Sequence, residues 1–250
     1  MSSYLPAPHL LAGRIILVTG ASDGIGKTAA MCFAEHGASV ILHGRSTSKL
    51  EKVYDEIEQR GWPQAAILPL DLEKATPAHY EQAAQTIDKE FGRLDGLLHN
   101  AADPGTLTPL ELYEPANWFR VMQVNLTAAW LFTRACLPLL KRSEDASIVF
   151  TTADVGRKGR AYWGAYGVAS FGLEGLMQTL ADEFATEGKI RVNSLNPGAV
   201  RTNLRSRLYP GESAQSLAKP EDIMGAYLYL LGPDSRGVTG KAIDAQGFGR

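Results

Sequence analysis

The chain has 250 residues, of which 45% are hydrophobic and 21% are charged, and its formal net charge is −2. This size and composition are typical of one large α/β domain or two small ones with a sizeable buried core. The balanced charge, with no basic block, argues against a nucleic-acid partner. No apolar run approaches the ~20 residues that a membrane helix requires.

The few signals of location and redox state suggest a cytoplasmic protein. The opening stretch MSSYLPAPHLLAGR lacks the basic start and long apolar run of a signal peptide. Cys32 and Cys136 lie far apart in apolar helical contexts, which predicts buried, reduced thiols. The five histidines show neither an H-x-x-x-H motif nor a Cys/His spacing typical of metal ligands, so we expect no metal site.

Apolar runs typical of strands alternate with helical segments along the whole chain. Strands are predicted at RIILVTG (14–20), ASVILHG (38–44), AAILPLDL (65–72), LDGLLHN (94–100), ASIVFTT (146–152), IRVNSLNPG (190–198) and GKAIDAQ (240–246). Helices are predicted at 24–36, 46–60, 77–91, about 115–140, 162–186 and 220–231.

This alternation predicts one domain over residues 1–250, an α/β fold with a Rossmann-type doubly wound parallel sheet and helices on both faces. No repeat or low-complexity linker interrupts it. The least regular stretch is 203–219, NLRSRLYPGESAQSLAK. Because ligands of such sheets bind beyond the carboxyl ends of the strands, we expect this stretch to be a substrate or lid loop.

A glycine-rich turn, TGASDGIG from Thr19 to Gly26, follows the first predicted strand and opens a helix. Glycines allow a tight turn and a close approach to a pyrophosphate, and a helix N-terminus offers free N–H groups to an anion. A plain strand-to-helix turn is the alternative, but the place at the first strand–helix junction favours a dinucleotide site. The candidate cofactor-binding residues of this turn are Gly20, Ser22, Asp23, Gly24, Ile25 and Gly26.

The GxxxGxG spacing of this turn resembles that of the classical short-chain dehydrogenase/reductase family. Other stretches agree in the same order: Asp71-Leu72, LHNAA, MQVNL and NPGAVRT. The resemblance implies that Asp71 and Leu72 contact adenine, that Asn125 is catalytic, and that further cofactor contacts come from Asn100, Ala101, Pro197, Gly198 and Thr202. VGRKGRAYWGAY and IDAQ also resemble the YciK-like subgroup of bacterial short-chain oxidoreductases.

The residues after the second predicted strand favour one form of the cofactor. This position carries His43-Gly44-Arg45, without the carboxylate that would bind a ribose 2′-hydroxyl. Arg45 suits a 2′-phosphate, so we expect NADP(H) to be preferred over NAD(H). A solvated surface arginine is the alternative, and Asp23 in the glycine turn is mildly unfavourable for NADP(H).

The catalytic positions implied by the resemblance are only partly filled. Tyr166 stands where the family has its acid–base tyrosine, whose phenol ordinarily titrates near ~10 and is assisted by an adjacent cation. Ser170 occupies the position of the family lysine, and Ala153 that of the family serine, thirteen residues before the tyrosine. Nearby residues offer two alternatives. Thr151 or Thr152 could supply the missing hydroxyl, and one of the loop residues Arg157, Lys158 and Arg160 could supply the missing positive charge.

Two functions stay open on this evidence. The first is an NADP(H)-dependent oxidoreductase that transfers hydride to or from a small carbonyl or alcohol substrate with weakened proton transfer. The second is a catalytically inactive dinucleotide-binding or assembly protein. The resemblance also implies a homodimer or homotetramer built on the two long helices near 115–140 and 162–186.

Overall fold

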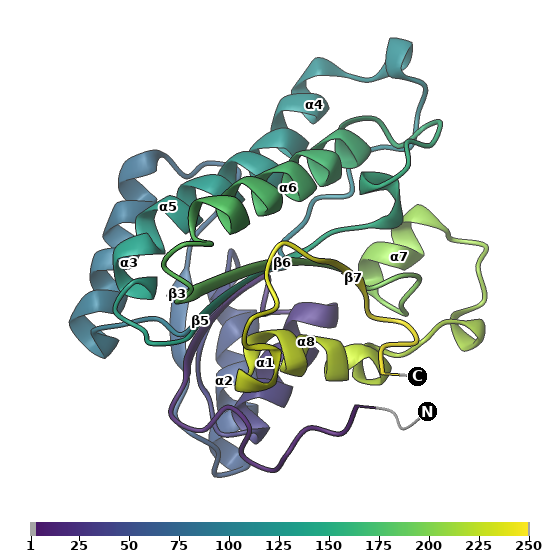
Figure 1. Cartoon of the computed structure of the whole chain (residues 1–250). Helices are drawn as coiled ribbons and strands as arrows, with labels where there is room; N and C mark the ends of the chain where they lie inside the picture. The colour runs from purple at the N-terminus through teal and green to yellow at the C-terminus, as the bar shows by residue number, and fades with distance from the viewer. Residues whose placement is uncertain (1–3, 250) are drawn as a thin grey trace.

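A computed structural model describes residues 4–249 of the chain (Figure 1). In this range seven strands form one parallel sheet in the order β3-β2-β1-β4-β5-β6-β7. The strands are β1 (Ile15–Thr19), β2 (Ser39–Gly44), β3 (Ala66–Pro69), β4 (Gly96–His99), β5 (Ala146–Thr151), β6 (Ile190–Asn196) and β7 (Ala242–Asp244). The order reverses between β1 and β4, so the predicted doubly wound Rossmann-type sheet is confirmed.

Helices cover both faces of the sheet (Figure 1). One face carries α1 (Gly24–Glu35), α2 (Thr47–Gln59) and α8 (Met224–Leu231), and the other carries α3 (Pro77–Phe91), α4 (Pro115–Met122), α5 (Ala128–Leu140) and α6 (Gly164–Glu183). Successive residues of β1 supply both cores: Leu17 packs on the α3–α5–α6 side, whereas Ile16 and Val18 pack on the α1–α2–α8 side. The central strand β1 is therefore continuously apolar from Ile15 to Val18, because neither face meets water. β6 is buried as well but carries polar side chains that are hydrogen-bonded: Arg191, Asn193 and Ser194.

The long helix predicted near 115–140 is continuous but changes its winding in the middle. Between α4 and α5 the five residues Gln123–Thr127 form a π-helical turn. Such turns are rare and often occur at functional sites. Here the turn contains Asn125, one of the predicted catalytic residues.

The stretch predicted as an irregular loop, 203–219, contains a short helix. α7 (Asn203–Leu208) begins after Thr202, whose hydroxyl accepts a hydrogen bond from the backbone N–H of Arg205 at 3.1 Å. This capping contact supports the helix even though its sequence, NLRSRL, lacks an apolar period. The segment still follows the carboxyl end of β6, as expected for a cover over the crevice.

Other boundaries differ by a few residues from the predictions. α6 begins at Gly164 rather than at 162, and a short 3₁₀ turn, Pro220–Ile223, precedes α8. Cys136 is buried as predicted, whereas Cys32 is partly exposed. Among residues 4–249, no helix is both long and apolar enough to cross a bilayer.

Candidate active site

The glycine-rich turn at the end of β1 is built so tightly that side chains are excluded from it. Gly20 and Gly24 have φ angles of +71° and +52°, in the left-handed region that favours glycine. A Cβ atom on Gly26 would lie 2.2 Å from the carbonyl oxygen of Gly20. The bare backbone and the N-terminus of α1 therefore form a cradle of the kind that holds a pyrophosphate, and these residues fit a dinucleotide.

Asp23 links this turn to the segment after β6. Its carboxylate caps α1 by accepting the backbone N–H of Gly24 at 2.7 Å. The same carboxylate accepts a hydrogen bond from the side-chain amide of Asn203, the first residue of α7, at 2.8 Å. Thr202 lies beside Gly24 as well, with its methyl carbon 3.3 Å from where a Gly24 Cβ would be. The predicted residues Asp23, Gly24 and Thr202 are thus brought together.

The ends of β1 and β4 are joined at the point where the strand order reverses. The hydroxyl of Thr19 accepts hydrogen bonds from the backbone N–H groups of Asn100 and Ala101, at 2.9 and 3.1 Å. A Cβ on Gly20 would approach the Cα of Ala101 to 3.0 Å. The predicted residues Asn100 and Ala101 therefore lie against the glycine turn, in the crevice where doubly wound sheets bind ligands.

Arg45 directly follows β2 and is exposed. Within residues 4–249 its guanidinium takes part in no hydrogen bond or ion pair, so it is available to an anion from solvent. Ser22 of the glycine turn lies next to Gly44, the residue before Arg45, because a Cβ on Gly44 would be 3.6 Å from the Ser22 hydroxyl. The predicted phosphate-binding residues of the turn and of β2 thus share one edge of the sheet.

Asp71 and Leu72 follow β3, the neighbour of β2, and hence lie at the same edge. Leu72 is buried, and its carbonyl accepts a hydrogen bond from the Gln123 side chain at 3.2 Å. The Asp71 carboxylate accepts the backbone N–H of Glu73 at 3.2 Å. Gln123 begins the π-helical turn, so the candidate adenine-binding stretch is tied to the element that carries Asn125.

The turn after β6 holds Pro197 and Gly198 at the same edge. Gly198 has a φ of +69°, and its N–H donates to the Asn196 side chain at 3.0 Å. This φ favours glycine, and a Cβ there would also press on the Gln246 side chain, at 2.7 Å from its amide nitrogen. The path from β6 through Thr202 to α7 therefore has a fixed shape.

Asn125 is buried, and its side chain binds the backbone of the loop after β4. Its carbonyl oxygen accepts the N–H of Asp103 at 2.7 Å, and its amide donates to the carbonyl of Asp103 at 2.9 Å. Arg120 forms an ion pair with the Asp103 carboxylate at 2.8 Å. Both the oxygen and the nitrogen of the Asn125 side-chain amide are therefore bound to this loop.

Tyr166 lies in the first turn of α6, partly buried, with its ring 5.4 Å from that of Trp163. Burial, assisted by the negative charge of Asp154, raises the pKa of Tyr166 to about 12. This direction is opposite to the one that a catalytic base needs. The phenol therefore stays protonated throughout the neutral pH range.

Neither replaced catalytic position supplies a group that reverses this shift. Ser170 is buried, and its hydroxyl donates to the carbonyl of Tyr166, one helical turn back, at 2.8 Å. It packs against the loop after β5, since a Cβ on Gly156 would lie 2.7 Å from the Ser170 Cβ. Ala153, at the start of that loop, has no hydrogen-bonding side chain.

The neighbouring hydroxyl groups have other partners. Thr152 is buried and donates to a carboxylate oxygen of Glu174 at 2.8 Å. The hydroxyl of Thr151 lies 3.3 Å from the phenol oxygen of Tyr227, which reaches it from α8. Neither contact leaves a hydroxyl directed freely at Tyr166.

Most of the loop cations are neutralised by carboxylates as well. Arg157 pairs with Glu174 at 3.2 Å and with Asp244 at 2.8 Å. Arg160 pairs with Asp154 at 2.6 Å. Lys158 is exposed and, within residues 4–249, forms no ion pair. The sequence left open whether a loop cation compensates for Ser170, and these contacts give no support to Arg157 or Arg160 in that role.

Comparison with known proteins fits this arrangement. The family model described as short chain dehydrogenase matches residues 14–213. This chain belongs to the short-chain dehydrogenase family. The resemblance seen in its motifs is thereby confirmed, and the chain is an oxidoreductase by family.

Its relatives are close in both sequence and structure. The Escherichia coli oxidoreductase YciK is 49% identical over 243 residues, which cover 97% of this chain and 96% of YciK. A short-chain dehydrogenase structure from Pseudomonas syringae has a TM-score of 0.96 at 55% identity, covering 98% of this chain and all of that one. Another, from E. coli CFT073 and complexed with NADPH, has a TM-score of 0.92 at 50% identity, covering 96% of this chain and all of that one.

Several residues near the short-chain dehydrogenase site were not found from the sequence. Glu174, one turn beyond Ser170, is buried and accepts hydrogen bonds from Thr152, Arg157 and Ser194. It joins β6 and the residue after β5 to α6, the helix that carries Tyr166. The sequence offers one signal for Glu174: it is a single charged residue within an otherwise apolar stretch of a predicted helix.

The segment after β6, which is predicted to cover the crevice, has an aromatic contact at its far end. Tyr209 follows α7, and its ring lies 6.2 Å from that of Trp163, the residue just before α6. The guanidinium of Arg205 stacks on Tyr209 at 3.9 Å and forms an ion pair with Glu212 at 2.7 Å. α7 and the residue after it therefore span from the glycine turn to the start of α6.

Two buried histidines lie near the carboxyl ends of β2 and β4. His43 packs edge-on against Phe132 at 5.3 Å, and its ring nitrogens have no hydrogen-bond partner among residues 4–249. His99 stacks on Phe150 and shares a hydrogen bond with Thr133 at 2.8 Å. Burial lowers the pKa of His43 to about 4. Burial, with His43 nearby, lowers that of His99 to about 3.

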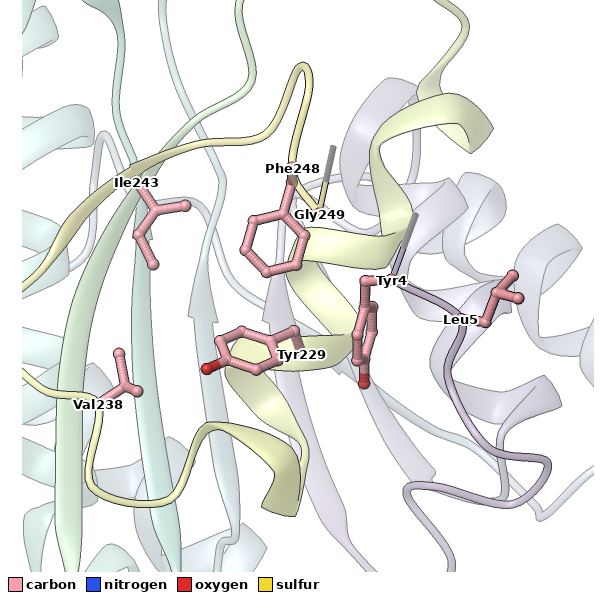
Figure 2. A pocket seen from close by; sticks show the side chains of 7 residues that line it. All are labelled: Tyr4, Leu5, Tyr229, Val238, Ile243, Phe248 and Gly249. Atoms are coloured by element: carbon pink, nitrogen blue, oxygen red, sulfur yellow. The ribbon is translucent and has the colours of Figure 1, made fainter. Parts of the chain in front are cut away.

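An open apolar groove of about 600 Å³ lies elsewhere, over α8 and β7 (Figure 2). Figure 2 shows Tyr4, Tyr229 and Phe248 grouped at its centre, with ring centroids 5.1–5.9 Å apart. None of the predicted site residues lines this groove. It is therefore separate from the candidate active site.

Proposed function

We propose that this chain is an NADP(H)-dependent oxidoreductase that acts on a small carbonyl or alcohol substrate, with weakened proton transfer. The proposal depends on one arrangement: the glycine turn, which leaves no room for side chains, lies beside the end of β2. There the guanidinium of Arg45 has no hydrogen-bond or ion-pair partner among residues 4–249. The turn and the N-terminus of α1 would hold the pyrophosphate, Arg45 the 2′-phosphate, and Asp71 and Leu72 the adenine. When bound, the dinucleotide supplies or accepts the hydride. The NADPH complex of the E. coli CFT073 relative supports the choice of cofactor.

Tyr166 is the proton-transferring residue in this proposal. With a pKa raised to about 12, its phenol is fully protonated at neutral pH, so it can donate a proton to an oxygen that becomes an alcohol. It is a poor base for the reverse reaction, because only a minute fraction is ionised. We therefore expect carbonyl reduction to exceed alcohol oxidation near neutral pH. Asn125 acts indirectly, by fixing the loop at Asp103 beside the crevice.

A second candidate function is a dinucleotide-binding protein without catalysis. It is favoured by the loss of the hydroxyl at Ala153 and of the ammonium at Ser170, together with the engagement of Thr152 and Arg157 by Glu174. Acid–base catalysis contributes factors of about 10² to 10⁴ in rate, so losing most of it would bring turnover close to background. Cofactor binding is common to both functions.

The first experiment is a fluorescence titration of the purified protein with NADPH and with NADH. We expect tighter binding of NADPH, and a loss of about tenfold to a hundredfold in NADPH affinity on Arg45→Ala, since a hydrogen bond to a charged group contributes about 1.5–3 kcal/mol. Affinity for NADH should stay unchanged. Lys49→Ala, an exposed cation two residues into α2, is the matched control. Equal affinities for the two nucleotides would contradict the role of Arg45.

The second experiment separates the two functions. Hydride transfer to a panel of aldehydes and ketones is measured for the unmodified chain and for Tyr166→Phe at saturating NADPH. A faster rate in the unmodified chain supports the oxidoreductase, whereas equal background rates support the inactive protein. The double variant Ala153→Ser, Ser170→Lys should raise turnover if the chain lacks only the hydroxyl and the ammonium group at these two positions.

The predicted homo-oligomer remains a proposal, and exposed apolar side chains support it. Phe119 on α4, Trp130 on α5 and Phe171 on α6 are 71%, 49% and 45% exposed. These helices are the long ones predicted to pair between copies. Light scattering should give a dimer or tetramer, and a monomer at micromolar concentration would refute the proposal. Phe119→Asp together with Phe171→Asp should shift the oligomer toward monomer.

A further inference from the structure

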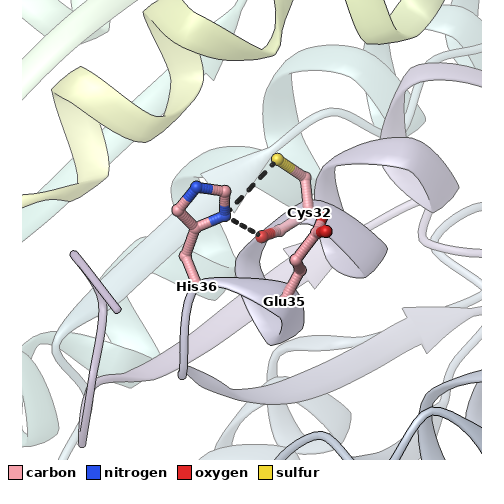
Figure 3. A group of neighbouring side chains, drawn as sticks. All are labelled: Cys32, Glu35 and His36. Carbon is pink, nitrogen blue, oxygen red and sulfur yellow. Dashed lines mark hydrogen bonds between the residues drawn. The ribbon is translucent and has the colours of Figure 1, made fainter. Parts of the chain in front are cut away.

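The last turn of α1 brings three different metal-binding side chains together. The Cys32 thiol, the Glu35 carboxylate and the His36 imidazole place their ligand atoms within 4.8 Å of one another (Figure 3). The Cys32 Sγ and His36 Nδ1 atoms are 3.9 Å apart. Figure 3 shows the imidazole turned toward the thiol, with Glu35 beside them.

This spacing is close to what a tetrahedral ion requires. Cys32 and His36 are four residues apart and so share one face of the helix. With metal–sulfur and metal–nitrogen bonds of ~2.3 and ~2.0 Å, the two ligand atoms of a tetrahedral zinc site lie roughly 3.5 Å apart. A shift of a few tenths of an ångström would therefore bring these atoms to coordination distance. Cys32 is only partly buried and Glu35 is exposed, so the cluster is open to an ion from solvent.

An independent electrostatic observation points to a cation at the same place. The C-terminal end of a helix carries partial negative charge, which a nearby cation stabilises. The last turn of α1 contains no basic residue, and it carries Glu35 instead. Within residues 4–249, Glu35 forms no ion pair, and the Nδ1 of His36 donates a hydrogen bond to the carbonyl oxygen of Cys32 at 2.8 Å, so this nitrogen carries a proton when no ion is bound. This helix end therefore lacks the positive charge that would balance it.

We propose that Cys32, Glu35 and His36 form a binding site for a zinc-class divalent ion. The ion takes the Cys32 sulfur, the His36 Nδ1 and a Glu35 carboxylate oxygen, and solvent completes the coordination. The thiol proton passes to solvent. The imidazole stays neutral, but its proton moves through solvent from Nδ1 to Nε2, and the hydrogen bond from Nδ1 to the Cys32 carbonyl is replaced by the bond to the ion. The mixed sulfur, nitrogen and oxygen ligands suit Zn²⁺ and exclude Mg²⁺ and Ca²⁺ as preferred ions, since these bind through oxygen.

The site lies at the end of α1 opposite the glycine turn, about 18 Å away for a 12-residue helix. The His36 carbonyl accepts the backbone N–H of Leu11 at 2.9 Å, and the Gly37 carbonyl accepts that of Gly13 at 3.2 Å. A bound ion would fasten the end of α1 to this segment ahead of β1. Its effect is therefore on stability, and it does not depend on the proposed oxidoreductase function.

The sequence expectation of no metal site rested on motif spacings. The Cys32-x-x-Glu35-His36 pattern is a helix-face spacing, and it becomes visible only once all three residues are placed in one helical turn. The cluster is also distant from every residue predicted to bind the cofactor. A motif search centred on catalysis has no reason to select it.

The test uses Zn²⁺ for affinity and Co²⁺ for spectroscopy on the full-length chain, after treatment with a chelator. We expect one Zn²⁺ per chain by competition with a chromophoric chelator, and a thiolate-to-cobalt absorption band with Co²⁺. Cys32→Ser, Glu35→Gln and His36→Gln should each weaken Zn²⁺ binding by at least about tenfold, the lower bound for losing even an outer-sphere partner. Cys136→Ser, which removes the other cysteine, should leave both signals intact.

Zn²⁺ should also raise the Tm of the unmodified chain and not that of Cys32→Ser. NADPH affinity should be the same with and without Zn²⁺. The site is refuted if no Zn²⁺ binds, if the cobalt band is absent, or if Cys32→Ser and His36→Gln bind Zn²⁺ as the unmodified chain does. Should those two variants fail to fold, Glu35→Gln, at an exposed position, decides the question by its Zn²⁺ affinity alone.

Discussion

Introducing a lysine at Ser170 should lower the pKa of Tyr166 by an amount that the structure allows to be worked out. Ser170 lies one helical turn beyond Tyr166, and the pKa of the phenol is about 12. An opposite charge within about 4–6 Å lowers such a pKa by about 1–3 units, so Ser170→Lys should bring it to about 9–11. At pH 8 the ionised fraction of the phenol would then rise about tenfold to a thousandfold.

The size of this shift agrees with a simple electrostatic calculation. One pKa unit corresponds to about 1.4 kcal/mol, and unit charges 4 Å apart interact by about 4 kcal/mol at an effective dielectric constant of about 20. Glu174 lies one further turn along α6 and could attract the new ammonium group. Because Glu174 already accepts hydrogen bonds from Thr152 and Arg157, we expect a reduced shift in Tyr166 rather than none.

The assay is a pH titration by NMR of protein labelled at the tyrosine ring carbons, with Tyr166→Phe identifying the Tyr166 signal. Val168→Lys is the matched control, because it adds the same charge to the same helix at a position that is 44% exposed. A folded Ser170→Lys protein in which the Tyr166 pKa stays near 12 would show that residue 170 does not face the phenol. The proposal that replacing a lysine by Ser170 weakens proton transfer by Tyr166 would then be wrong.

Three further perturbations test the fold and the site. Gly26→Ala should abolish dinucleotide binding and lower the free energy of unfolding by about 1–3 kcal/mol, because its Cβ would lie 2.2 Å from the carbonyl oxygen of Gly20. Gly175→Ala, with open space around it, should leave the free energy of unfolding unchanged or raise it. Denaturant unfolding that gave the opposite order would show that the glycine turn is loosely packed. The pKa of His43 falls from about 6.5 in the unfolded chain to about 4 in the fold, so below pH 6.5 the unfolded chain binds the proton more readily. The free energy of unfolding should therefore be highest above pH 6.5 and fall by about 3 kcal/mol as the pH drops to 4. A His43→Phe variant with the same pH dependence of unfolding would contradict this. Glu174→Ala should cost about 2–6 kcal/mol, because it leaves the buried hydroxyl groups of Thr152 and Ser194 without an acceptor, at about 1–3 kcal/mol each, while Arg157 keeps its ion pair with Asp244. An unchanged Tm would contradict this role of Glu174.

The sequence predicted the sheet and most helices because their signals are local. Apolar runs such as that of β1 are continuous when both faces are buried, and α3 begins and ends where its proline and glycine indicate. The missing features depend on contacts between distant residues. α7 is supported by the Thr202 cap, and the π-helical turn at Asn125 leaves no mark in periodicity.

The candidate site was predictable in its positions but not in its chemistry. Motif spacing gave Tyr166, Ser170 and Ala153, yet whether a neighbour compensates depends on where the tips of long side chains lie. The structure places Arg157 on Glu174, a residue seventeen positions along the chain. Only folding brings that carboxylate beside the loop, so no pattern of nearby residues could have revealed that Arg157 is already occupied.

The hydrogen bond between Asp23 and Asn203 has a consequence for the order of events during binding. It connects the nucleotide end of the crevice to α7, while Tyr209 rests on Trp163 at the other end. Lifting α7 therefore breaks a contact at the glycine turn, and any ligand that stabilises one end changes the free energy of opening at the other. Such a linkage acts equally in both directions. We therefore expect nucleotide binding and the movement of α7 toward α6 to be coupled in one equilibrium.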